Sequence, residues 1–208
     1  MDIINHLKET YGYGTPIFLK DIRIGGKSKT AIRQELSRAT KRGEIIRKCD
    51  GVYYFKEEAN IGGAVTFDMI VEKRFIKNDY FNLGLDFDVY GYFTGGTFLN
   101  QIGLSQQVPA IDEIVTNHTS CKRYYKIGRR EVLLRPAKVY ITFFNYKALQ
   151  FFDMFYYLEP EEVEACKDII KEYARKYVSK DDFDNYIRFF DFRIIKVIIE
   201  KGIANAFK

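Results

Sequence analysis

Two aspartates, Asp86 and Asp88, stand one residue apart near the middle of the chain. Alternate residues of a strand face the same side, so two such carboxylates can hold one Mg²⁺ ion between them. Nucleotidyltransferases use a pair of this kind with a Gly-Ser turn shortly upstream, but here the nearest Gly-Gly, Gly62-Gly63, lacks the serine. A solvated loop is therefore the favoured interpretation, and a metal-dependent nuclease or transferase stays as an alternative.

The sequence lacks the other common catalytic patterns. The histidines, His6 and His118, are too few and too far apart for a metal site, and three scattered cysteines fit neither a disulfide framework nor a zinc site. No nucleophile elbow, P-loop or dinucleotide fingerprint occurs. The run Thr94–Thr97 (Thr-Gly-Gly-Thr) offers amides to an anion, but it is better explained as a sharp turn into a helix. We therefore expect no catalysis, no metal and no cofactor.

The positive charge of the protein is concentrated at one end. The chain has 208 residues and a formal net charge of +5. Residues 1–57 hold 12 Lys or Arg against 7 Asp or Glu, whereas residues 58–208 hold 21 of each. A basic segment on a neutral body is typical of a polyanion-binding module attached to a domain with another task.

A basic helix is predicted over Lys29–Arg42, with Ser28 as its N-cap and Gly43 just past its end. At 100° per residue its apolar residues fall on one side and its donors on the other, with Glu35 toward the apolar flank. We predict that the donor side, the residues before the helix and a following hairpin contact DNA. These candidates are Lys27, Ser28, Lys29, Thr30, Arg33, Gln34, Ser37, Arg38, Lys41, Arg47 and Lys48.

The elements around this helix suggest how it is held. Asp2–Tyr11 is predicted to be a helix, and Phe18, Leu19 and Ile22 are predicted to form a second short apolar turn, taken as the short helix of the motif. Strands at Ile45–Lys48 and Val52–Phe55 flank the turn dipeptide Asp50-Gly51. Two short helices or turns, a basic helix and a hairpin describe a winged helix-turn-helix in residues 1–57, whose main alternative is a protein-docking module.

The remainder, residues 64–208 after a polar linker, is predicted to be a larger α+β domain. Helices are expected at Asp68–Ile76 and Thr94–Ile102, and strands at Ile111–Thr116, Lys122–Ile127, Arg130–Leu134 and Lys138–Phe144. A helical tail follows, with helices over Tyr146–Leu158 and from Pro160 to Lys176, and a final helix or helix pair from Lys180 to Lys201. The fold class is thus α+β, with a mainly antiparallel sheet and C-terminal helices.

The run Phe143–Tyr157 is unusually rich in aromatic residues. Rings of this kind can stack on nucleobases, but the charges of the run are sparse and balanced. A buried core or a partner interface is the favoured interpretation. The role of this helix is left open at this stage.

Two stretches together resemble the AbiEi family of bacterial antitoxins. The first is Lys27–Phe55 (KSKTAIRQELSRATKRGEIIRKCDGVYYF), which is similar to that family's N-terminal winged helix. The second is Tyr90–Asn117 (YGYFTGGTFLNQIGLSQQVPAIDEIVTN), which resembles a long motif of its C-terminal domain. The resemblance covers roughly residues 1–150. One departure is Asp50 before Gly51, where the family more often has a basic residue.

The resemblance implies the antitoxin half of a type IV toxin–antitoxin system tied to phage abortive infection. In such a protein the N-terminal domain binds inverted repeats in its own promoter as a transcriptional autorepressor. The C-terminal domain counters a nucleotidyltransferase-like toxin, without a requirement for a stable complex. A stand-alone winged-helix transcription regulator is the alternative, and an enzyme using Asp86 and Asp88 is the second alternative. No membrane span or secretion signal is seen, so a cytoplasmic location is expected.

Overall fold

The structure, a computed structural model, describes residues 2–56, 64–78 and 88–208. The expected linker 57–63 and Asp86 lie outside the described residues. The described parts combine helices with small sheets, which confirms the α+β class. Within these ranges, none of the helices has the length and apolar character needed to cross a bilayer.

The chain forms two compact units. The first contains the described residues up to Arg74 together with 127–129, and the second contains the remaining described residues. The division passes through α3 (Phe67–Phe75) and isolates the tip of one hairpin from its strands. Each unit is built around its own core, so each is considered separately.

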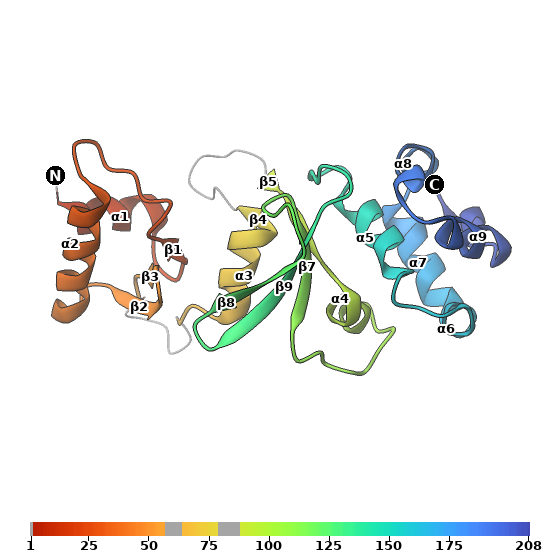
Figure 1. Cartoon of the computed structure of the whole chain (residues 1–208), viewed down its shortest axis with the longest axis horizontal. Coiled ribbons are helices and arrows are strands. Elements are labelled where there is room, and N and C mark those ends of the chain that lie inside the picture. Colours follow the sequence, from red (N-terminus) through yellow and green to blue (C-terminus); the bar gives the residue numbers. More distant parts are fainter. Residues whose placement is uncertain (1, 57–63, 79–87) are drawn as a thin grey trace. The chain divides into compact units, whose positions relative to one another are not determined.

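The N-terminal unit packs two helices on a three-stranded sheet (Figure 1). Its strand order is β1-β3-β2, and both pairs of strands are antiparallel. Its core contains Leu7, Ile17, Leu36 and Tyr53 among other apolar side chains. The elements are α1 (Ile3–Tyr11), β1 (Ile17–Phe18), α2 (Lys29–Arg42), β2 (Ile46–Cys49) and β3 (Val52–Tyr54).

Local signals fix the ends of these elements. The Asp2 side chain caps α1 by accepting a hydrogen bond from the Ile4 amide at 3.0 Å. The turn between β2 and β3 uses Gly51 at φ +70°, a conformation that glycine adopts without steric cost. A register shift between Arg47 and Cys49 marks a β-bulge beside this turn. The hairpin predicted around Asp50-Gly51 is therefore confirmed.

The apolar turn expected around Phe18, Leu19 and Ile22 is present at residues 19–21, but its interpretation as a short helix is wrong. Ile17 and Phe18 instead form β1, which pairs with Tyr53 and Val52 of β3. The Leu19 amide then donates to the Gly51 carbonyl at 2.8 Å, and a turn follows. Because the backbone donors of this segment serve the sheet, the segment does not wind into a helix.

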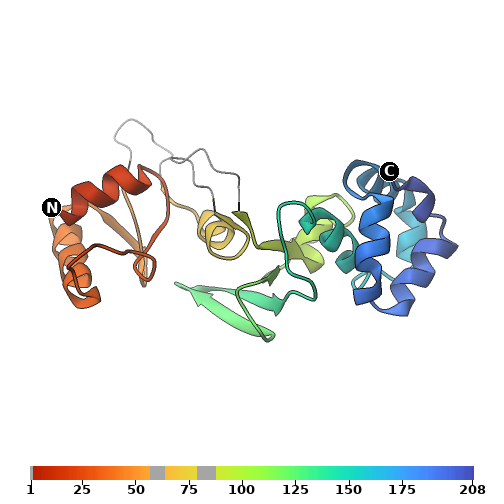
Figure 2. The same ribbon diagram turned by 90° about the horizontal axis from the view of Figure 1, so that it is seen from above.

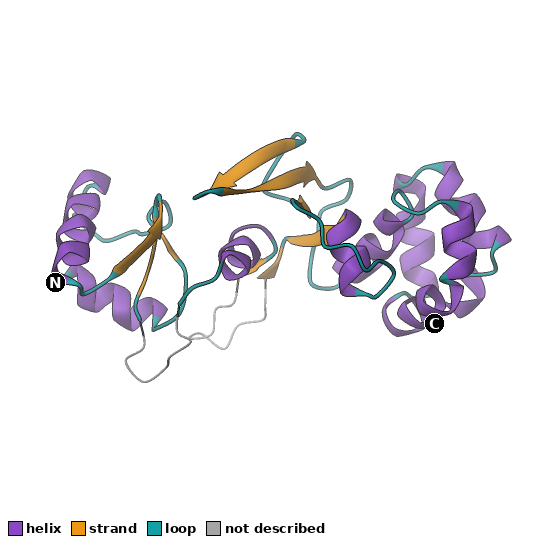
Figure 3. Ribbon diagram, turned by 90° about the horizontal axis from the view of Figure 1, so that it is seen from below, coloured by secondary structure: helices purple, strands orange, loops and turns teal. Residues whose placement is uncertain are grey.

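The second unit places a four-stranded sheet beside a cluster of C-terminal helices, which Figures 2 and 3 show from opposite sides. A separate pair of short strands, β4 (Lys77–Asn78) and β5 (Asp88–Val89), precedes it. The sheet and its adjoining helix are β6 (Gly91–Thr94), α4 (Gly95–Gln101), β7 (Asp112–Thr116), β8 (Arg123–Ile127) and β9 (Arg130–Pro136). The helices after it are α5 (Tyr146–Met154), α6 (Pro160–Ala165), α7 (Lys167–Tyr177), α8 (Lys180–Tyr186) and α9 (Phe192–Glu200), with 3-10 turns at Ile187–Phe189 and Ala204–Ala206.

The larger sheet is not wholly antiparallel. Its order is β6-β7-β9-β8, and β6 pairs antiparallel with β7, but β7 and β9 run parallel. The expected mainly antiparallel sheet therefore contains a parallel pair at its centre. This arises because β8 occupies the edge and the chain returns through β9 beside β7.

The strand predicted at Lys138–Phe144 is wrong, because this segment is a loop. The side chain of Asn117 replaces a neighbouring strand: its Nδ2 donates to the Ile141 carbonyl at 2.8 Å, and its Oδ1 accepts from the Ile141 amide at 3.0 Å. Ile141 is buried, whereas Phe143 and Phe144 are exposed. An Asn anchor thus satisfies the backbone that a sheet would have paired.

The helical tail follows the sequence with one interruption. The single helix expected from Pro160 is broken at Cys166 into α6 and α7. A capping box starts α8, in which the Ser179 hydroxyl accepts from the Asp182 amide while Asp182 accepts from the Ser179 amide. The core of this unit is ring-rich, with Phe98, Phe151 and Phe152 fully buried.

Candidate nucleic-acid interface

Helix α2 has one side in the core and one side in solvent. Ser28 caps it by accepting a hydrogen bond from the Ala31 amide at 3.1 Å, and Gly43 closes it in the left-handed conformation. Ile32, Leu36 and Ala39 are buried against the core of the N-terminal unit. The predicted span and orientation of this helix are confirmed.

The structure exposes all eleven residues that the sequence suggested for DNA contact. Those before and at the start of α2 are Lys27, Ser28, Lys29 and Thr30. Those along the solvent side of the helix are Arg33, Gln34, Ser37, Arg38 and Lys41, and those on the hairpin are Arg47 and Lys48. They therefore lie on α2, the segment before it and the hairpin, all within one compact unit.

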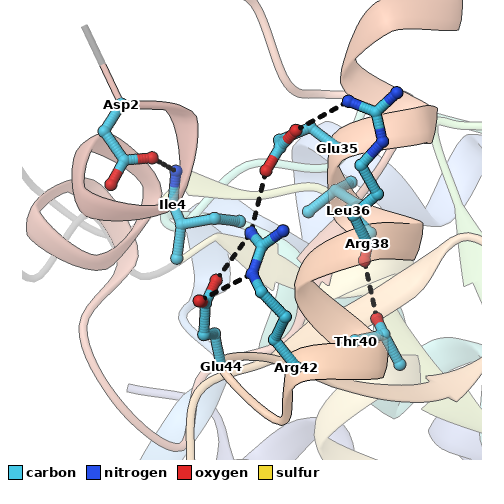
Figure 4. Close-up of polar contacts among 8 residues, drawn as sticks. All are labelled: Asp2, Ile4, Glu35, Leu36, Arg38, Thr40, Arg42 and Glu44. Carbon is cyan, nitrogen blue, oxygen red and sulfur yellow. Dashed lines mark hydrogen bonds and ion pairs between the residues drawn. The ribbon is translucent and has the colours of Figure 1, made fainter.

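The carboxylate of Glu35 holds the C-terminal part of α2 in a small ion-pair network (Figure 4). Its Oε1 lies 2.9 Å from Nη2 of Arg42, whose Nε donates to Glu44 at 2.8 Å. The hydrogen bonds that Arg42 donates, first to Glu44 and then to Glu35, raise its pKa. Arg42 is thus committed to two carboxylates, so its charge is neutralised within the unit.

Glu35 also approaches the solvent side of the helix. Its Oε2 lies 3.6 Å from Nη1 of Arg38, although the Arg38 side chain is 67% exposed. The sequence placed Glu35 on the apolar flank but did not predict that its carboxylate reaches a candidate DNA-contacting arginine. Arg38 therefore carries a weak internal partner that a phosphate would have to replace.

Each of the four carboxylates between Lys20 and Lys56 has a basic partner in the same segment. Asp21 pairs with Lys20, and Asp50 at the hairpin tip pairs with Arg47. Glu35 and Glu44 are taken up by the arginines of α2. No carboxylate within the described residues pairs with the five exposed cations Lys27, Lys29, Arg33, Lys41 and Lys48.

The residues that could suggest catalysis do not form a site within the described part of the second unit. Asp88 lies exposed in β5, and its proposed companion Asp86 is outside the described residues. Across the described ranges, no three His, Cys, Asp or Glu side chains converge as metal ligands. His118 stacks on the Tyr90 ring at 4.2 Å between centroids, and the three cysteines are free thiols.

The Thr94–Thr97 run is the start of α4 and serves the fold. Thr94 is buried, and its hydroxyl donates to the buried carboxylate of Asp153. Gly95 adopts φ +60°, and a Cβ there would lie 3.1 Å from both Glu113 and Tyr157. The glycine is needed for the turn and for close packing, as the sequence interpretation favoured, and Thr94 is directed into the protein.

A buried polar network around Asp153 was not predicted from the sequence. Asp153 comes from the aromatic run on α5, and burial raises the pKa of its carboxyl group. Close by, Tyr157 donates to Glu113 and accepts from Arg135, which joins α5 to strands β7 and β9. The only sequence signal was one acidic residue among many rings, and its buried partners are distant along the chain.

The aromatic run itself divides into two parts. From Phe151 to Phe155 the rings are buried in the core of the second unit, as favoured by the sequence interpretation. Phe143 and Phe144 at its start are 50% and 90% exposed. The run is therefore core at one end and surface at the other.

No protein-family model, curated protein or solved structure matches the chain.

Proposed function

We propose that the N-terminal unit is a winged-helix module that binds double-stranded DNA, and that the protein is an antitoxin and autorepressor. The observation that carries the DNA-binding proposal is a set of five exposed cations that have no carboxylate partner among the described residues: Lys27, Lys29, Arg33, Lys41 and Lys48. A surface of one charge sign on an exposed helix suits the phosphate backbone of a duplex. A helix of this width fits the major groove.

The strand order supports a winged-helix interpretation with a shortened second helix. The segment between α1 and α2 contributes β1 to the sheet, and the β2–β3 hairpin extends beyond it as the wing. In this proposal, α2 enters the groove and the hairpin reaches the neighbouring backbone. The turn at residues 19–21 takes the place of the helix that usually precedes the recognition helix.

The roles of the candidate residues follow from their positions. Arg33, Gln34, Ser37 and Arg38 lie along the middle of α2 and are assigned to base edges and groove walls. Lys27, Lys29, Lys41, Arg47 and Lys48 lie at the helix ends and on the hairpin and are assigned to phosphates. Ser28 and Thr30 flank the helix start, where backbone amides also attract a phosphate.

The antitoxin part of the proposal rests on the resemblance of Lys27–Phe55 and Tyr90–Asn117 to the AbiEi family. In this view the second unit counters a nucleotidyltransferase-like toxin in the cytoplasm, and the first unit represses the shared promoter. The stand-alone regulator shares the DNA-binding step, and a nucleotidyltransferase gene directly downstream distinguishes the two.

Titration of a duplex from the region upstream of the gene tests DNA binding. With about five phosphates neutralised, the logarithm of affinity should fall against that of salt concentration with a slope of roughly −4 to −5. Arg33→Ala should cost about 1–3 kcal/mol and relax sequence preference, whereas Lys48→Ala should weaken all duplexes alike and reduce the slope by about 1. Equal losses on specific and unrelated duplexes for both variants would contradict this division of roles.

The two functions can be separated in the full chain. An Arg33→Ala, Lys41→Ala double variant should release the promoter but still rescue cells that express the toxin, because both changes lie on exposed α2 positions. Loss of rescue with the fold and expression level preserved would contradict the assignment of neutralisation to the second unit.

A further inference from the structure

An aromatic surface with two lysines lies on the second unit, at the start of α5 and the end of α7. We call it the ring–lysine surface, and its members are Phe143, Phe144, Tyr146, Lys147, Lys176 and Tyr177. Phe144 is 90% exposed, and Phe143 is 50% exposed. Other phenylalanines of the same run are fully buried in the core, whereas these two rings lie outside it. Their exposure therefore calls for an explanation other than core packing.

The rings of this surface form a continuous series. Phe143 meets Phe144 edge to face with centroids 5.7 Å apart, and Phe143 lies 6.4 Å from Tyr146. Lys147 bridges onward, because its ammonium lies 5.1 Å from the Tyr146 ring centre and 5.0 Å from that of Tyr177. Ring faces and edges therefore extend from the exposed loop to α7.

The two lysines are close to the same ring. The ammonium of Lys176 lies 5.0 Å from the centre of Tyr177, as does that of Lys147. Neither lysine has a carboxylate partner in the described part of the chain. Burial, followed by the charge of Lys176, lowers the pKa of Lys147. A half-buried ammonium beside a second one is electrostatically costly, and an anion between them relieves that cost.

The loop that carries the rings is held in place by side-chain hydrogen bonds. Asn145 is buried, and its Oδ1 accepts from the Thr142 amide at 2.8 Å while its Nδ2 donates to the Tyr140 carbonyl at 3.0 Å. Asn117 fixes Ile141 through both of its backbone groups. Phe143 and Phe144 are therefore presented from an ordered turn, which lowers the entropic cost of binding.

We propose that the ring–lysine surface binds single-stranded nucleic acid, with unpaired bases stacked on Phe143 and Phe144 and phosphates paired with Lys147 and Lys176. Aromatic platforms bordered by cations are the general means by which proteins hold single strands without sequence preference. A duplex keeps its bases stacked on one another and cannot use the rings in this way. This site is separate from the duplex interface on α2 and does not depend on the proposed function.

Fluorescence anisotropy with labelled oligouridine and oligothymidine of about ten nucleotides tests the proposal in the full chain. Phe144→Ala should weaken binding of the single strand by about 5- to 150-fold, which corresponds to one lost base stack. Phe192→Ala is the matched control, because Phe192 is also an exposed ring of this unit, at 76%, but lies on α9. It should leave the affinity unchanged. Comparison of the two oligonucleotides shows whether the ribose hydroxyl contributes.

Charge and duplex binding provide the second comparison. Lys176→Gln should lower the affinity for the single strand and reduce the salt dependence of that affinity. Lys196→Gln on α9 should change neither. Phe144→Ala should leave the affinity for a duplex unchanged. Arg33→Ala should lower the affinity for a duplex far more than the affinity for a single strand. Equal single-strand affinity of Phe144→Ala and Phe192→Ala would overturn the proposal. Toxin rescue lost in Phe144→Ala without any oligonucleotide binding would also overturn it, and would assign the rings to a protein partner.

Discussion

Glu35 and Arg38 lie one helical turn apart on α2, with Oε2 of Glu35 3.6 Å from Nη1 of Arg38. The same carboxylate binds Arg42 at 2.9 Å, so it connects the Arg42–Glu44 pair at the end of α2 with Arg38 on the solvent side of the helix. This places a negative charge at the edge of the proposed DNA-binding surface. It provides a direct way to adjust the affinity for DNA.

Glu35→Gln should strengthen duplex binding. The change removes one negative charge near the phosphates and frees Arg38, while Arg42 keeps Glu44 as a partner. Surface pairs contribute about 0–1 kcal/mol, so we expect a gain of roughly 2- to 5-fold with little change in stability. A duplex titration measures it, and Glu9→Gln on α1 is the control of equal charge change. Weaker binding than the wild type would show that Glu35 positions Arg38 for DNA.

Asp50→Asn should also strengthen duplex binding, through the hairpin. Asp50 is 97% exposed and pairs with Arg47, and Asn-Gly supports the same tight turn as Asp-Gly. Without Asp50 as a competitor, the contact of Arg47 with a phosphate should strengthen, so duplex affinity should rise by roughly 2- to 5-fold. Asp21→Asn changes the net charge equally but frees Lys20 instead. If both variants behave alike, the gain comes from net charge and the hairpin has no specific role.

The wild type should gain stability over an Asp153→Asn variant as the pH is lowered, because of the buried carboxyl group of Asp153. Burial raises the pKa of this carboxyl group in the folded state, so folding favours its protonated form. Its contribution is complete below the unfolded pKa of about 3.9 and is lost as pH rises through the raised folded value. The free energy of unfolding of the wild type, minus that of Asp153→Asn, should therefore decrease from pH 4 toward neutrality.

Urea unfolding followed by circular dichroism measures this difference, since the chain has no tryptophan. The asparagine can still accept the hydrogen bond that Thr94 donates. A difference that stays constant, or grows with rising pH, would contradict the assignment of a raised pKa to Asp153.

Gly91→Ala should prevent the second unit from folding. A Cβ at this position would lie 2.0 Å from the Phe75 carbonyl oxygen and 2.8 Å from that of Val115, and backbone atoms cannot move aside cheaply. We expect a loss of roughly 4 kcal/mol or more, visible in thermal unfolding. Gly25→Ala has open space around its Cβ and should be close to neutral. A fully stable Gly91→Ala protein would mean that β6 does not pack as described.

The sequence predicts elements whose signals are local. Ser28 and Gly43 mark the ends of α2 because a cap and a left-handed glycine act within one turn of the helix. Asp50-Gly51 likewise fixes its hairpin. The surface of α2 followed from the same periodicity, since Ile32 and Leu36 alternate with donors at helical spacing.

Features that depend on distant partners were missed. Lys138–Phe144 has the composition of a strand, but Asn117 occupies the backbone of Ile141 from 24 residues away. The residues at 17–18 entered a sheet whose other strands lie beyond α2. Asp153 is buried and accepts a hydrogen bond from Thr94, which lies 59 residues earlier in the chain. Local propensity contains none of this information.

Lysine footprinting by acetylation and mass spectrometry, with and without the promoter duplex, tests most directly whether the exposed side of α2 binds DNA. Lys27, Lys29, Lys41 and Lys48 should lose reactivity when the duplex is bound, while Lys196 and Lys201 on the second unit should react as before. Unchanged reactivity of the first four lysines under conditions where the duplex is bound would contradict the account.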